Sequence, residues 1–171
     1  MKYMSEDSKI AQLYGKSDIY ECKILIFGNI KTFDFLTIEH EEHGKILTQV
    51  KNIVRDDEKL IGDVKIIGFK DAGVLKSIRT PFSNNAYIGI SNDEEIEEII
   101  GLFKDHSSCL GLLEHHPNLE ISLDLKKIIS KHVAVLAKSG AGKSYTVGVI
   151  LEEIIRKKIP ILILDPHNEY S

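Results

Sequence analysis

Nine residues from Ala137 to Tyr145, Ala-Lys-Ser-Gly-Ala-Gly-Lys-Ser-Tyr, are of the types that bind phosphate. They match the pattern G-x-x-x-x-G-K-[ST] at every position except the first, where Ala137 stands in place of glycine. Alanine still permits a tight turn there if its φ stays negative. The other interpretation is a chance glycine-containing turn, and the apolar runs on both sides of the loop argue against it.

In a loop of this kind the backbone N–H groups converge on a phosphate, and the following helix adds the positive end of its dipole. The ammonium group of Lys143 would reach the terminal phosphates, and the hydroxyl of Ser144 would ligate Mg²⁺. We therefore expect contacts to a nucleotide from Lys138, Ser139, Gly140, Ala141, Gly142, Lys143, Ser144 and Tyr145.

A second polar run, Asp-Pro-His-Asn-Glu-Tyr at 165–170, follows an apolar stretch. Carboxylates at the carboxyl end of a strand lie where α/β proteins place their ligands. Asp165 or Glu169 could therefore ligate the water shell of Mg²⁺ or polarise the attacking water, which makes both candidate catalytic residues beside Lys143. The simpler alternative is a polar turn at the end of a strand.

The neighbouring elements would position these residues. The apolar run 132–137 predicts a buried strand, 143–158 predicts an amphipathic helix, and the continuous apolar run 159–165 predicts a central parallel strand. Together they form a β–α–β unit with a right-handed crossover. One such unit cannot bury its own faces, so we expect the chain to be a truncated part of a longer protein.

The first half of the chain has a different pattern. After a polar lead-in at 1–17 with little core of its own, five or six short β-rich runs with turn signals between them occupy 18–90. This pattern predicts a small antiparallel β-barrel with a bulge in the long strand 45–55 and a bulge or close approach at Gly68. An acidic helix begins near 91–93, with Ile96, Ile99 and Ile100 on its apolar face.

Residues 104–124 read as a connector with short extended pieces at 110–113 and 120–123 and a turn at Pro117–Asn118 between them, and Asp124 reads as the N-cap of a short helix at 125–129. The fold class is thus α/β overall. We expect two domains: 1–103, the β-barrel with its C-terminal acidic helix, and 104–171, the connector and the incomplete start of a P-loop domain.

The net charge is −4, without the basic excess typical of a small DNA-binding module, although a local basic patch can oppose a net charge. No apolar run approaches the ~20 residues of a membrane span, and the N-terminus has no apolar signal core. The two cysteines, Cys22 and Cys109, are too few for a disulfide framework. We expect a cytoplasmic protein with no membrane partner.

Two histidines, His40 and His43, flank two glutamates at a predicted hairpin tip. They could bind zinc, but the chain has no second ligand group with a matching spacing. This favours solvated turn residues over a metal site.

The runs Ser139–Tyr145 and Asp165–Tyr170, with the strand and helix around them, resemble the HerA family of archaeal and bacterial hexameric DNA translocases. This family belongs to the HerA/FtsK group of P-loop ATPases and often has glycine where Ala137 and Asn168 stand here. The β-rich first half resembles the N-terminal HAS-barrel of the family, followed by the start of a RecA-like ATPase domain.

The resemblance implies ATP hydrolysis with Mg²⁺, coupled to movement along double-stranded DNA. It also implies a hexameric ring of copies of the protein and work with a NurA-like nuclease in DNA-end resection and repair. The Walker B residues, the catalytic glutamate and the arginine finger would lie beyond Ser171, so the resemblance also implies that this chain alone is inactive as an ATPase. Two other classes stay open: a ring ATPase of the secretion or rotary type, and a non-catalytic assembly module.

Overall fold

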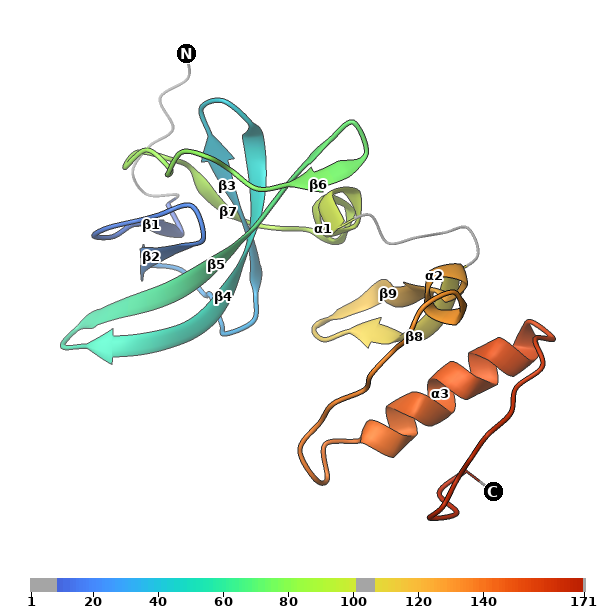
Figure 1. The fold of residues 1–171 in the computed structure, drawn as a ribbon. Helices are drawn as coiled ribbons and strands as arrows, with labels where there is room; N and C mark the ends of the chain where they lie inside the picture. Colours follow the sequence, from blue (N-terminus) through green and yellow to red (C-terminus); the bar gives the residue numbers. More distant parts are fainter. Residues whose placement is uncertain (1–8, 101–106, 171) are drawn as a thin grey trace. The chain divides into compact units, whose positions relative to one another are not determined.

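The strands between residues 11 and 90 form one curled antiparallel sheet (Figure 1). The computed structural model describes residues 9–100 and 107–170. The chain divides into two compact units, Met1–Gly101 and Leu102–Ser171. The elements of the first unit are β1 (Ala11–Leu13), β2 (Glu21–Ile26), β3 (Phe35–His40), β4 (Gly44–Asp56), β5 (Lys59–Asp71), β6 (Val74–Lys76), β7 (Ile88–Ile90) and α1 (Asp93–Ile100). Buried and exposed side chains alternate along strands such as β2 and β5.

The strand order is β1-β2-β5-β4-β3-β7, with β6 added beside β5 and every pairing antiparallel. β1 and β7, at the two ends of this order, lie close together, so the sheet curls into a half-barrel. This agrees with the barrel-like domain predicted from the sequence. The closure is not completed by hydrogen bonding, because among the described residues no strand ladder joins β1 to β7.

The alternation explains which side chains fill the half-barrel. On β2, Cys22, Ile24 and Ile26 point inward and are buried, and each such side chain contributes roughly 1.5–3 kcal/mol. On β4 three consecutive residues, 46–48, are buried because the register shifts between Leu47 and Thr48. The bulge predicted for this strand is therefore confirmed.

The prediction of a lead-in with little core of its own at 1–17 is wrong for residues 11–13. These residues form β1, which pairs with β2, and Ala11 is buried. The alternation of three residues is too short to be recognised in a sequence. Residues 1–8 lie outside the described residues.

Helix α1 begins at a reciprocal cap. The Asn92 side chain accepts the N–H of Glu95 (2.8 Å), and the Glu95 carboxylate accepts the N–H of Asn92 (3.3 Å). Glu95 also accepts hydrogen bonds from Lys45 (2.5 Å) and Thr37 (3.3 Å), which join the helix to β3 and β4. The Lys45 ammonium is the main reason that the pKa of Glu95 lies below its ordinary value.

Replacement of Glu95 by glutamine should lower the free energy of unfolding by about 1 kcal/mol at pH 7. Because the native pKa of Glu95 is lowered, its stabilising effect is complete above the ordinary pKa of 4.5 and disappears as the pH falls through the lowered value. Urea unfolding of both proteins at pH 7 and near pH 3 measures this. Glu94→Gln, on the exposed side of the same turn, is the control, and an equal pH effect in both variants would contradict the role of Glu95.

Gly68 allows β6 to fold back against β5. Its φ is +133°, and a Cβ atom at this position would lie 2.2 Å from the carbonyl oxygen of Lys76. No side chain fits in that space. The close approach predicted at Gly68 is therefore confirmed, and it fixes where the chain continues after β6.

The second unit contains β8 (Ser107–Leu113), β9 (His116–Asp124), α2 (Leu125–Ile129) and α3 (Lys143–Arg156). The predicted turn at Pro117–Asn118 is wrong, since both residues lie in β9 and the hairpin turns at Glu114 and His115. His115 has a φ of 64°, so the turn tolerates a residue that sequence rules do not favour there. The cap predicted at Asp124 is confirmed, because its side chain accepts the N–H of Lys127 (3.1 Å).

The helix predicted over 143–158 forms as α3 and ends two residues earlier. The strands predicted at 132–137 and 159–165 do not form, so the helix is the one part of the predicted β–α–β unit that is seen. A strand needs a ladder partner, and β8 and β9 pair only with each other among the described residues. Leu136, Leu162 and Leu164 in these segments are at least 85% exposed.

Both cysteines are free, and burial raises the pKa of the Cys22 thiol to about 12. In the part of the chain that the structure describes, no helix is both long enough and apolar enough to cross a membrane.

Candidate nucleotide-binding site

The loop before α3 is a glycine turn. The N–H of Ala141 donates to the carbonyl of Lys138 (3.1 Å), and Gly140 and Gly142 adopt the left-handed region with φ of 78° and 84°. Side chains at these two positions would be strained, which explains the glycines. Ala137 is not among the residues with positive φ, so alanine is accommodated at the one position that departs from the pattern.

The start of α3 leaves backbone donors available. Gly142 is the N-cap and offers no side chain to the helix, and the first intrahelical bond runs from the N–H of Thr146 to the Gly142 carbonyl (2.9 Å). The N–H groups of Lys143, Ser144 and Tyr145 precede that bond. They lie at the positive end of the helix dipole, which favours an anion.

The structure brings the two predicted motifs together. The hydroxyl of Ser144 donates a hydrogen bond to the carboxylate of Glu169, 25 residues further along the chain. Asp165 has a different partner, because its carboxylate accepts the N–H of Tyr170 (2.9 Å) and so holds the turn in which Glu169 lies. Asn168 has a φ of 57°, a conformation that asparagine and glycine tolerate best.

A cavity of about 530 Å³ lies beside this contact. Ser144, Tyr145 and Glu169 line it, with Tyr170 and apolar residues of α3. The other predicted contact residues are exposed on the loop: Lys138, Ser139, Gly140, Ala141, Gly142 and Lys143. The hydroxyl and carboxylate oxygens of Ser144 and Glu169 are hard ligands of the kind that Mg²⁺ prefers, so this pair fits the metal predicted at Ser144.

The zinc alternative at the hairpin tip finds no support. No three His, Cys, Asp or Glu side chains gather as a metal-ligand set within residues 9–100 and 107–170. The prediction that both histidines are solvated turn residues is wrong for His40, which is only 7% exposed. Its Nε2 lies 3.0 Å from the carbonyl oxygen of Thr80, a contact across 40 residues that the local sequence does not reveal.

The sequence is similar to proteins of one family. The family described as "Helicase HerA, central domain" matches residues 108–171. A probable DNA double-strand break repair helicase HerA of Methanocaldococcus jannaschii is 30% identical over 161 residues, which are 94% of this chain and 32% of that protein.

Two further relatives are DNA double-strand break repair helicases HerA. That of Pyrococcus furiosus is 32% identical over 147 residues, which cover 85% of this chain and 25% of the relative. That of Sulfolobus acidocaldarius is 40% identical over an alignment of 187 positions, which covers 94% of this chain and 36% of the relative. The chain thus spans about a third or less of the length of these relatives. Because this family matches the C-terminal part of the chain and the HerA relatives match most of its length, the chain belongs to the HerA helicase family.

Proposed function

We propose that this chain is the N-terminal part of an ATP-driven double-stranded DNA translocase and helicase that acts in double-strand break repair. The observation that carries the proposal is the contact between Ser144, at the uncapped start of α3, and Glu169 of the second motif. Family membership supports the DNA substrate, because the relatives are named repair helicases. The activity is proposed for a protein of the relatives' length.

Each residue of the site has a proposed role. The N–H groups from Lys138 to Tyr145 bind the phosphates of ATP, and the exposed ammonium of Lys143 neutralises the charge that develops at the terminal phosphates. Mg²⁺, when bound, supplies Lewis-acid polarisation of a phosphoryl oxygen. Ser144 and Glu169 hold the metal or its water shell, and Asp165 keeps Glu169 in position by fixing the turn.

The proposal includes a hexameric ring of copies of the protein, a NurA-like nuclease partner and a cytoplasmic location. The support for these is the resemblance to the family. We also propose that the two segments beside α3, 132–137 and 159–165, are the P-loop strand and the second strand of a RecA-like unit. Their exposed leucines are the side chains that a strand buries when neighbouring strands cover it.

The test is ATP turnover by the whole protein with linear double-stranded DNA, with single-stranded DNA and without DNA. We expect turnover that double-stranded DNA raises several-fold. Turnover that no DNA changes would contradict the translocase proposal and favour a ring ATPase of the secretion or rotary type. Nucleotide binding without turnover would favour a non-catalytic assembly module.

A further inference from the structure

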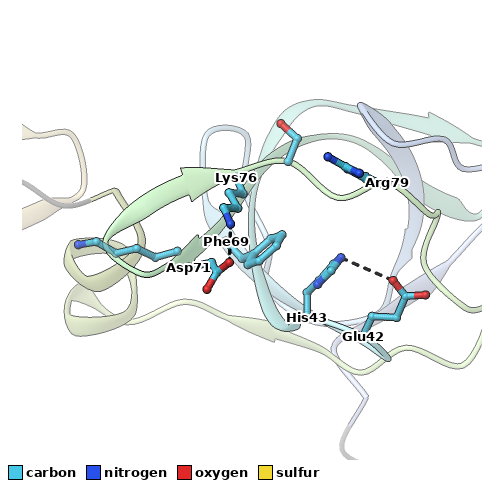
Figure 2. Close-up of a pocket in the computed structure, with 8 residues that line it drawn as sticks. Glu42, His43, Phe69, Asp71, Lys76 and Arg79 are labelled. Carbon is cyan, nitrogen blue, oxygen red and sulfur yellow. Dashed lines mark hydrogen bonds and ion pairs between the residues drawn. The ribbon is translucent and has the colours of Figure 1, made fainter.

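A second cavity, of about 550 Å³, lies on the first unit, far along the sequence from the glycine loop. Its walls come from the β3–β4 turn, the end of β5, β6 and the segment that follows β6 (Figure 2). Its volume is within the range of small-molecule sites. Nothing in the proposed function uses it.

Two residues that line the cavity, His43 and Phe69, belong to a stack of rings. His43 stacks on Phe69 at 4.3 Å and on His40 at 5.0 Å, and Phe82 meets His40 edge-on at 5.7 Å. Nδ1 of His40 accepts the N–H of Glu42 (3.2 Å), so its Nε2 carries the proton and donates to the carbonyl of Thr80 (3.0 Å). The stack therefore ties the chain after β6 to the hairpin tip.

The segment 77–82 presents alternate residues to the cavity. Ile78 and Phe82 are buried at 1% and 5% exposure, and the backbone of Thr80 is held by His40. Arg79, between Ile78 and Thr80, lines the cavity instead, and so does Ser77, which directly precedes Ile78. The side chain of Arg79 thus projects from a backbone that is fixed on both sides of it.

The charges in the cavity do not balance. The Asp71 carboxylate is engaged by Lys76 (2.5 Å), whose ammonium keeps the pKa of Asp71 below its ordinary value. Glu42 lies 3.7 Å from Nε2 of His43. Figure 2 shows these two pairs with Arg79 apart from both. Among the described residues neither Arg79 nor Lys70 has a carboxylate partner, and the lining carries the three cations Lys70, Lys76 and Arg79 against the two carboxylates of Glu42 and Asp71.

We propose that this cavity binds a phosphate monoester through Arg79, Ser77 and Lys70. The guanidinium fork, a hydroxyl and an ammonium offer more donors than the two oxygens of a carboxylate can accept, and they match the three oxygens of a phosphate. A nucleic-acid backbone fits less well, because residues 1–101 contain 13 Lys and Arg against 18 Asp and Glu. The phosphate belongs either to a small molecule or to the end of a nucleic-acid strand.

The test is an NMR titration of the ¹⁵N-labelled 171-residue chain with inorganic phosphate, AMP and adenosine. Phosphate and AMP, but not adenosine, should shift the amide signals of residues 77–79. The titrations are repeated in the Lys143→Ala background, because the glycine loop is a separate candidate for phosphate. Shifts at 77–79 that persist there are independent of the proposed nucleotide site.

The decisive variant is Arg79→Gln, which should weaken phosphate and AMP binding by about tenfold or more, because a charge-assisted fork is lost. Arg55→Gln is a matched control, since Arg55 is exposed near the far end of β4 and lies outside the cavity. Unchanged binding in Arg79→Gln, or equal losses in both variants, would overturn the proposal. So would adenosine binding as well as AMP.

The source of the phosphate is tested with a short oligonucleotide, with and without a 5′-phosphate. If the phosphorylated strand binds more tightly than AMP and loses affinity in Arg79→Gln, the ligand is a strand end. If AMP binds at least as well, the ligand is a small phosphate monoester. Equal binding of both oligonucleotides, unaffected by Arg79→Gln, would count against a phosphate site.

Discussion

In the whole protein, Lys143→Ala is expected to lower ATP turnover by about a hundredfold or more, the scale seen when one preorganised donor to developing charge is removed. Lys143 is the first residue of α3, and its side chain is exposed. Its ammonium can therefore reach a nucleotide held by the N–H groups that no side chain caps. Steady-state ATP hydrolysis measures the effect.

Lys131→Ala is the control for this variant, because Lys131 is also exposed but precedes the loop. It should turn over ATP at close to the unchanged rate. If Lys143→Ala keeps near-normal turnover while the protein remains folded, the assignment of 138–145 as a nucleotide-binding loop fails. A comparable loss in Lys131→Ala would point to a general effect of charge on the second unit.

Gly68→Ala should destabilise the first unit by about 3 kcal/mol, through backbone strain and a clash together. The added Cβ would stand 2.2 Å from the Lys76 carbonyl oxygen, and the backbone there has a φ of +133°. Because the obstructing atom belongs to the backbone of β6, it cannot rotate away. Urea unfolding followed by circular dichroism measures the change, since the chain contains no tryptophan.

Gly73→Ala separates the two causes. Gly73 has a φ of +80° in the turn between β5 and β6, but a Cβ there would meet nothing within 4 Å. It should cost only about 1 kcal/mol, the strain of a non-glycine residue in the left-handed region. If both variants lost the same stability, the close approach of β6 to Gly68 would not be a determinant of the fold.

The parts of the fold that were predictable from the sequence are those set by short-range patterns. The strand over residues 19–27, the bulge in 45–55 and the caps at 91–93 and Asp124 depend on neighbours within a few residues. The strands predicted at 132–137 and 159–165 are not seen in the described residues, because an apolar run shows that a segment would be buried but not that a partner strand is present. The extended pieces predicted at 110–113 and 120–123 lie in β8 and β9, but the turn between them was misplaced because Glu114 and His115 are not strong turn residues.

The candidate site was predictable only to the level of its motifs. Spacing placed Lys143 and Ser144 at a helix start, but it could not separate Asp165 from Glu169. That difference depends on how the chain turns at Asn168, which lets Tyr170 bind Asp165 and leaves Glu169 for Ser144. The cavity around Arg79 could not be predicted, because the segment that carries Arg79 is held by a contact between His40 and Thr80, 40 residues apart in the sequence.

The alternation in 77–82 separates the residues that hold this segment from those that face the cavity. Ile78 and Phe82 belong to the core, so substitution there carries a penalty in folding. Ser77 and Arg79 are exposed and do not belong to the core, so their substitution should cost little stability. Proteins that share this half-barrel can therefore differ in the ligand they bind through substitutions at positions 77 and 79 alone. The same two positions are suitable for engineering a new binding specificity.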